Sequence, residues 1–180
     1  MVAASTLDRQ AFLERAERIR LVLTDVDGTL TDGTVYVSKE GEAMKRFSLR
    51  DGMGVERLPD AGIDTGLVTR EVSPPVAQRA QKLDIRHVFC GVRDKAAYVP
   101  EILARAGTLA QEVASIGDDV NDLGILQAIG EVGLTGAPAD AVPIVRRAVH
   151  HIAAARGGGQ KAFREFVQWI LSSRDTGTEP

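Results

Sequence analysis

The sequence predicts an α/β fold in which helices cover both faces of a parallel sheet, giving the three layers of a doubly wound, Rossmann-like domain. Two observations support this prediction. Apolar runs of strand length alternate with helical patterns along the chain. The first of these runs, residues 19–24, ends abruptly in two carboxylates, Asp25 and Asp27. Because ligands of open parallel sheets bind beyond the carboxyl ends of the strands, we expect the chemistry at this end of the sheet.

The length and composition are those of one ordinary globular domain. The chain has 180 residues, of which 44% are hydrophobic and 26% charged, with a formal net charge of −3. The lack of a basic tract argues against nucleic acid as a partner. No apolar run reaches the roughly 18 residues of a membrane-spanning helix, and the N-terminus lacks the pattern of a secretory signal. We therefore expect a cytoplasmic protein without a membrane partner.

Cysteine and histidine suggest little further chemistry. The single cysteine, Cys90, excludes an internal disulfide and a cysteine-based zinc cluster. We interpret Cys90 as a small packed residue rather than a nucleophile. His150 and His151 lack the spacing of a zinc-binding helix, and we expect both at the surface.

The predicted elements follow one another as a doubly wound fold requires. An opening helix is expected over residues 5–18, where Ser5 or Thr6 can cap its start. After the first strand, residues 34–37 and 43–48 predict a β-hairpin. Arg50 to Gly54 predicts a turn into a short helix through Leu58. The remaining expected strands are 65–69, 85–89, 113–116 and 132–134, and the remaining expected helices are 74–83, 95–103, 123–129, 142–149 and 162–171.

Prolines and glycines punctuate these elements. Pro74 and Pro75 are typical of a first helical turn, and Pro100 is expected near the first turn of the helix that Lys95 opens. A flexible glycine run, residues 157–159, leads into the last, amphipathic helix. We divide the chain into an N-terminal helix, a single domain and a disordered tail, with the bounds 1–18, 19–171 and 172–180.

Polar residues gather where strands end or helices begin. They are Asp25 and Asp27, Thr69, Lys95, and the cluster Asp118, Asp119 and Asp122. Carboxylates from two strands form the oxygen cage that Mg²⁺ prefers, and a lysine with a threonine hydroxyl suits a phosphoryl group. One aspartate could attack phosphorus while a second protonates the leaving oxygen. The combination predicts phosphoryl transfer through an aspartyl-phosphate, with Mg²⁺ as the cofactor.

Each of these residues also has an ordinary structural explanation. Thr69 could be a strand-end residue, Lys95 a solvated lysine, and Asp118 with Asp119 a helix cap. The receiver domains of response regulators use similar parts for signalling, but they place their acidic pair first and the phosphorylated aspartate on a later strand. Here an Asp-x-Asp pair opens the site and a second acidic cluster follows the lysine. The order of the residues therefore favours an enzyme.

The motifs resemble those of the haloacid dehalogenase superfamily, and the resemblance spans residues 19–171. It is carried by Asp25-Val26-Asp27-Gly28-Thr29, Thr69, Lys95 and Gly117-Asp118-Asp119-Val120-Asn121-Asp122. By this resemblance Asp25 is the nucleophile and Asp27 the acid/base. Mg²⁺ would bind Asp25, Asp118 and the backbone carbonyl of Asp27. Thr69 and Lys95 would hold the phosphoryl oxygens, and Asp122 would orient Lys95. Asp119 would lie next to the metal ligands without binding the metal itself.

The intervals between motifs are too short for the cap domain that many members carry. Only the hairpin flap and short elements fit between Asp27 and Thr69, or between Thr69 and Lys95. An open site needs another way to exclude water, such as a neighbouring subunit. The chain resembles the capless group that contains 3-deoxy-D-manno-octulosonate 8-phosphate phosphatases, which implies a homotetramer acting on a phosphorylated 2-keto-3-deoxy sugar acid. The resemblance implies that the glycine-rich segment folds over a site and that the sugar acid is contacted by Ser48, Arg50, Asp51 and Gly52.

One departure from that group bears on the substrate. The second motif reads Thr69-Arg70-Glu71, where Thr-Gly-Arg is usual. Glu71, with Arg79 and Lys82, is more similar to relatives that hydrolyse nonulosonate (sialic acid type) 9-phosphates. An ion pair of Glu71 with Arg79 or Lys82 on the surface would explain the pattern equally well. A third alternative is a non-catalytic module that binds sugar acids or serves as a scaffold.

Overall fold

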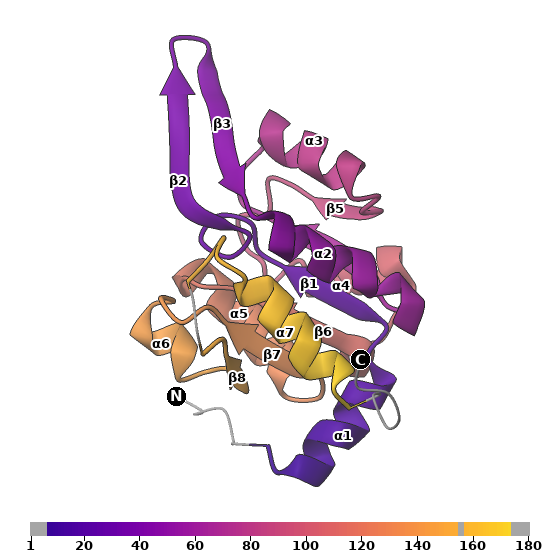
Figure 1. Cartoon of the computed structure of the whole chain (residues 1–180). Helices are drawn as coiled ribbons and strands as arrows, with labels where there is room; N and C mark the ends of the chain where they lie inside the picture. Colours follow the sequence, from indigo (N-terminus) through magenta and orange to yellow (C-terminus); the bar gives the residue numbers. More distant parts are fainter. Residues whose placement is uncertain (1–6, 155–156, 174–180) are drawn as a thin grey trace.

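A six-stranded parallel sheet forms the centre of the molecule, in the strand order β5-β4-β1-β6-β7-β8. The computed structural model describes residues 7–154 and 157–173 (Figure 1). The strands are β1 (Leu21–Thr24), β4 (Asp64–Val68), β5 (His87–Phe89), β6 (Val113–Ile116), β7 (Leu134–Ala137) and β8 (His151–Ile152). Every neighbouring pair in the sheet runs parallel. The predicted α/β doubly wound architecture is confirmed.

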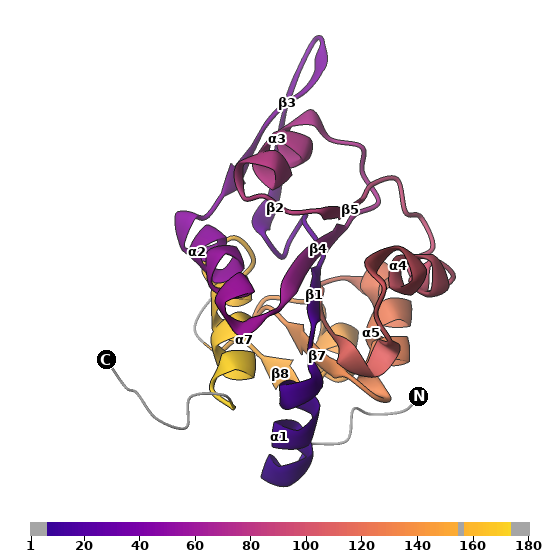
Figure 2. The ribbon, with the colours of Figure 1, turned by 90° about the vertical axis from the view of Figure 1, so that its right-hand side faces the viewer.

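Helices cover both faces of this sheet, as Figure 2 shows. The helices are α1 (Arg9–Arg18), α2 (Leu49–Arg57), α3 (Pro74–Lys82), α4 (Val99–Ala106), α5 (Leu123–Gly130), α6 (Pro143–Arg146) and α7 (Ala162–Leu171). Successive side chains of a strand point to opposite faces. Val22 packs with residues of α2, α3 and α7, whereas Leu21 and Leu23 pack with residues of α4 and α5. Burial on both faces explains why β1 is apolar throughout.

A β-hairpin of β2 (Thr31–Ser38) and β3 (Gly41–Phe47) projects from the domain (Figure 1). Between β1 and β4 the chain forms only this hairpin, α2 and the short 3-10 helix η1 (Pro59–Ala61). Between β4 and Lys95 it forms only α3 and β5. The hairpin flap and the absence of a cap domain, both predicted, are confirmed for the part of the chain that the structure describes.

The predicted turn at residues 50–54 is wrong, because these residues lie inside α2. Ser48 caps the helix, accepting hydrogen bonds from the backbone N–H groups of Arg50 and Asp51. The two glycines serve packing rather than a turn. A Cβ on Gly52 would lie 2.5 Å from the guanidinium of Arg79, and one on Gly54 would lie 3.2 Å from the ring of Phe163. Close packing therefore overrides the low helix propensity of glycine here.

Several other boundaries differ from the predicted ones. The helix expected to open at Lys95 begins at Val99, which places Pro100 in the first turn, where proline is tolerated. The opening helix begins at Arg9 with Asp8 as its cap, and residues 5 and 6 lie outside the described residues. The fifth predicted strand begins at 134 instead of 132, and α6 is shorter than the predicted helix 142–149. The tail beyond residue 173 also lies outside the described residues.

The expectations for Cys90, His150 and His151 are corrected. Cys90 is exposed rather than packed. Both histidines are partly buried: the Nδ1 atom of His150 accepts a hydrogen bond from the backbone N–H of Thr135, and the ring of His151 stacks on Trp169. Burial and the charge of Arg15 lower the pKa of His150 to about 4, so it packs as a neutral ring. In the described ranges we find no helix with the length and apolar character needed to span a bilayer.

Candidate active site

Three predicted site residues follow three adjacent strands. Asp25 follows β1, Thr69 follows the neighbouring β4, and Asp118 lies two residues beyond β6 on the other side of β1. Because the strands are parallel, all three lie at one edge of the sheet. Asp25, Asp118 and Asp122 each offer a carboxylate oxygen, and these oxygens lie within 4.8 Å of one another. The parallel pairing of these strands thus brings the acidic side chains into a single cluster.

Lys95 lies among these carboxylates, in the turn before α4. Its Nζ atom donates to Oδ1 of Asp25 and to Oδ1 of Asp122, each at 2.5 Å, and its side chain is only 1% exposed. The second oxygen of Asp122 accepts from the backbone N–H groups of Asp118 and Asp119. Asp122 therefore holds both the lysine and the loop that carries Asp118.

The electrostatics of the cluster show a shortage of positive charge. Burial raises the pKa of Asp25 to about 8, Lys95 acts to lower it, and Asp122 and Asp118 raise it further. Burial and Asp122 raise the pKa of Asp118 to about 7. Burial acts to lower the pKa of Lys95, but the charges of Asp25 and Asp122 outweigh burial and raise it. Three carboxylates facing one lysine are a set that a hard divalent cation fits.

Asp25 and Asp118 are placed to hold such a cation, and the loop after β1 is shaped around Asp118. Gly28 has a φ of +96°, and a Cβ at this position would lie 2.1 Å from Oδ2 of Asp118. The Oγ1 atom of Thr29 donates to Oδ1 of Asp118 at 3.1 Å. Only glycine at position 28 allows this close approach of the loop to the carboxylate.

The carboxylate of Asp27 lies outside this cluster and has a partner that the sequence reasoning missed. The Nζ atom of Lys45, on β3, donates to Oδ1 of Asp27 at 2.5 Å, and the lysine side chain is only 3% exposed. The Oδ2 atom of Asp27 is buried and has no hydrogen-bond partner among the described residues. One signal could have identified Lys45. Phe47, two residues on, packs against the core, and alternate residues of a strand share a face.

Thr69 and Asp119 take up different surroundings. Thr69 is buried, and its Oγ1 atom accepts a hydrogen bond from the backbone N–H of Glu71 at 3.1 Å. Asp119 is exposed and uses Oδ1 to accept from the backbone N–H of Val120 at 2.6 Å, at the start of η3 (Val120–Asp122). Thr69 therefore lies at the carboxyl end of its strand, as predicted, whereas Asp119 mainly caps the following turn.

Three of the residues expected to contact the sugar acid, Ser48, Asp51 and Gly52, line one small cavity together with Arg79. Asp51 is buried, and its two oxygens accept from the backbone N–H groups of Lys161 and Arg164 at the start of α7. Each oxygen thus accepts one hydrogen bond from the start of α7, and a contact of Asp51 with the sugar acid stays a prediction. Gly52 is buried against Arg79. Ser48 caps α2 and is partly exposed, and Arg50 is exposed, so these two remain available to a ligand.

Glu71 and Lys82 are exposed, and no ion pair joins Glu71 to Arg79 or Lys82 within residues 7–154 and 157–173. Arg79 instead donates to the backbone carbonyl of Ser48 at 3.2 Å. The surface ion pair considered for Glu71 is thus absent among the described residues. The charge of Glu71 remains available to a ligand.

The glycine-rich segment packs against the loop of its own chain that follows β1. The backbone N–H of Gly159 donates to the carbonyl of Thr29 at 2.9 Å. A Cβ on Gly158 would lie 1.7 Å from the carbonyl oxygen of Gly28, so no larger residue fits without moving the loop. The segment therefore supports the loop that carries Asp27 and Gly28.

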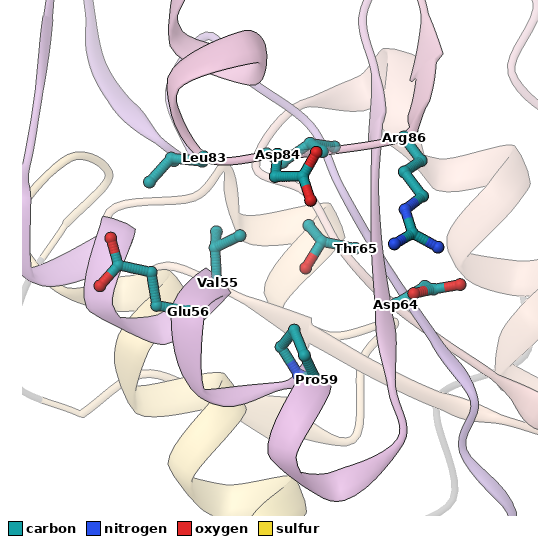
Figure 3. Close-up of a pocket in the computed structure, with 9 residues that line it drawn as sticks. Val55, Glu56, Pro59, Asp64, Thr65, Leu83, Asp84 and Arg86 are labelled. Carbon is teal, nitrogen blue, oxygen red and sulfur yellow. The ribbon is translucent and has the colours of Figure 1, made fainter.

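A separate hollow of about 150 Å³ lies beside the amino end of β4 (Figure 3). Its lining includes Glu56, Asp64, Asp84 and Arg86. None of the predicted site residues lines it. Because ligands of parallel sheets bind at the opposite, carboxyl end of the strands, this hollow is not the candidate active site.

Comparisons with known proteins agree with this geometry. No protein-family model matches the chain. A 3-deoxy-D-manno-octulosonate 8-phosphate phosphatase from Haemophilus influenzae is 38% identical over 161 residues, which cover 89% of this chain and 87% of the relative. A Legionella pneumophila structure, named as a hydrolase of haloacid dehalogenase (HAD) subfamily III A, is 34% identical with a TM-score of 0.84, covering 92% of this chain and 89% of that one.

A second solved structure has ligands. It is a Moraxella catarrhalis 3-deoxy-D-manno-octulosonate 8-phosphate phosphatase in complex with a magnesium ion, a phosphate ion and a molecule of the sugar acid. It is 30% identical with a TM-score of 0.84, and the match covers 92% of this chain and 93% of that one. The chain therefore belongs to the 3-deoxy-D-manno-octulosonate 8-phosphate phosphatase family of the haloacid dehalogenase superfamily.

Proposed function

We propose that this chain is a Mg²⁺-dependent phosphatase that hydrolyses 3-deoxy-D-manno-octulosonate 8-phosphate. The observation that carries the proposal is the meeting of Asp25, Asp118 and Asp122 around Lys95, with Asp27 held apart by its own lysine. The family relationship supports the substrate, since the relatives at 30 to 38% identity carry the name of this activity.

The reaction divides into two steps at phosphorus. An oxygen of Asp25 attacks, the bond between phosphorus and the sugar oxygen breaks, and Asp27 gives its proton to that oxygen. A water molecule then gives a proton to Asp27 and attacks the phosphorus of the aspartyl-phosphate, which releases inorganic phosphate and restores the Asp25 carboxylate and the protonated Asp27. Lys95 and Thr69 donate hydrogen bonds to the phosphoryl oxygens during both steps.

Mg²⁺ has a defined place in this scheme. Asp25, Asp118 and the backbone carbonyl of Asp27 would hold it. When bound, it supplies the positive charge that lets a phosphoryl group approach several carboxylates. The raised pKa values of Asp25 and Asp118 support this placement, because they mark carboxylates that lack sufficient positive charge.

The choice of sugar is tested with a panel of substrates. We expect kcat/KM of the wild type to be higher for octulosonate 8-phosphate than for a nonulosonate 9-phosphate. Glu71→Arg restores the positive charge usual in this group, so we expect it to shift the ratio further toward the octulosonate by about tenfold. Glu101→Arg, at an exposed position on α4, is the matched control.

Three outcomes of this panel would require a different reading. A wild type that prefers the nonulosonate phosphate would favour the second substrate class. An unchanged ratio in Glu71→Arg would show that Glu71 is not the selector. A wild type that releases phosphate from neither compound would support the non-catalytic, sugar-acid-binding alternative.

We also propose that the protein is a cytoplasmic homotetramer. The hairpin supports an oligomer, since it exposes apolar side chains: Val35 (44%), Tyr36 (53%), Val37 (72%) and Met44 (57%). Apolar groups concentrated on a projecting hairpin are typical of an interface. Without a cap domain, a neighbouring subunit would exclude water from the site. The single cysteine and the ordinary soluble composition are compatible with the cytoplasm.

The hairpin interface predicts the effect of one substitution. We expect Val37→Asp to convert the tetramer into monomers and to lower kcat/KM by at least about tenfold, because a charge in an apolar interface is costly and the site loses its cover. Light scattering after size-exclusion chromatography measures the mass. Val132→Asp makes the same change at another exposed valine and should keep the wild-type mass. A monomeric wild type would contradict the proposal.

A further inference from the structure

We infer that Lys45 is a positioning residue for proton transfer: it holds Asp27 by one carboxylate oxygen and leaves the other free to exchange a proton. The inference rests on the proposed function, because that function makes Asp27 the acid/base. It gives the hairpin a role in proton transfer, through the side chain of Lys45.

The contact between the two residues is close and shielded. The Nζ atom of Lys45 lies 2.5 Å from Oδ1 of Asp27, and the two side chains are 3% and 30% exposed. The other oxygen, Oδ2, is buried without a hydrogen-bond partner among the residues that the structure describes. Since a buried carboxylate oxygen normally has a partner, Oδ2 is the atom left for a ligand. Lys45 thus fixes which oxygen of Asp27 reacts.

Lys45 also has a second acidic partner, Glu42. Its Nζ atom lies 3.5 Å from Oε2 of Glu42, and Oε1 of Glu42 accepts a hydrogen bond from the hydroxyl of Ser73. Ser73 is buried and caps α3. A continuous set of polar contacts therefore runs from α3 through the hairpin to Asp27, and the placement of β3 fixes the Asp27 carboxylate.

The other lysine of the hairpin shows that this arrangement is not general. Lys39 is 90% exposed, and its nearest acidic partner is the neighbouring Glu40 at 3.5 Å. Exposed pairs of this kind contribute little, whereas removing one member of a shielded pair disturbs the geometry of the other. Lys39 is therefore the matched control for Lys45 on the same hairpin.

The test compares two leaving groups. A sugar oxygen needs a proton as it leaves, whereas the phenolic oxygen of p-nitrophenyl phosphate leaves without one. We expect Lys45→Met to lower kcat/KM for octulosonate 8-phosphate by about 30-fold and for p-nitrophenyl phosphate by less than about threefold. Lys45→Arg should recover most of the loss, because it restores the positive charge. Lys39→Met should behave as the wild type with both substrates.

Several outcomes would contradict the inference. Equal losses with both substrates would overturn the inference, since Lys45 would then act on the phosphoryl group or the fold. Wild-type values in Lys45→Met would overturn it as well. A wild type without phosphatase activity would overturn the proposed function and this role together. If Lys45→Met does not fold, Glu42→Gln provides the test: we expect a smaller loss confined to the sugar phosphate, and equal losses would overturn the inference.

Discussion

Asp25→Asn should reduce phosphate release from octulosonate 8-phosphate by at least about 10⁴-fold, because an amide cannot attack phosphorus. The fold should survive the change. The amide side chain would keep an oxygen for the Nζ atom of Lys95, and a neutral group suits a site whose burial already raises the pKa of the Asp25 carboxyl. The measurement is phosphate release at saturating Mg²⁺, with a thermal melt of the same sample.

The control for this variant is Asp60→Asn, an exposed aspartate on η1 that should leave the rate unchanged. More than about 1% of the wild-type rate in Asp25→Asn would contradict the role of Asp25 as nucleophile, since only a non-covalent route could account for it.

Lys95→Met is expected to remove both activity and stability. The variant leaves Asp25 and Asp122 buried without their shared cation, and breaking a buried ion pair costs about 3 to 5 kcal/mol in the free energy of unfolding. The cost should be larger at pH 8 than at pH 5. The pKa of Asp25 is raised in the folded state, so stability linked to its protonation is present at low pH and is lost as the pH rises.

Urea unfolding at the two pH values measures this difference. Lys39→Met, which removes an exposed lysine, should change the free energy of unfolding by less than about 0.5 kcal/mol. A loss in Lys95→Met that is equal at pH 5 and pH 8 would contradict the account of the unpaired carboxylates.

The sequence was sufficient to locate the acidic cluster. Asp25 ends a buried apolar strand, and the neighbours of that strand end in Thr69 and Asp118, so parallel pairing alone brings them to one edge. The capless arrangement followed from the short intervals between these residues. Local pattern and topology thus define the centre of the site.

Contacts between distant parts of the chain could not be predicted from the sequence. Asp51 lies near the expected site in the sequence, yet its carboxylate caps α7, more than 100 residues away. The glycines of α2 indicated a turn because their packing against Arg79 and Phe163 is invisible in local propensity. Lys45 shares a strand face with Phe47, but its pairing with Asp27, 18 residues away, is a contact that local pattern does not give.

The covalent intermediate is the most direct test of the proposed mechanism. Asp27→Asn should slow the hydrolysis of the aspartyl-phosphate, so it should accumulate label when quenched in acid after mixing with p-nitrophenyl [³²P]phosphate and Mg²⁺, because the phenolic oxygen of this substrate leaves without a proton from Asp27. We predict label on the peptide that contains Asp25, sensitive to hydroxylamine as an acyl phosphate is, and none when Asp25 is also replaced by asparagine. Label on another residue, or no label in an enzyme whose wild type turns over, would contradict the account.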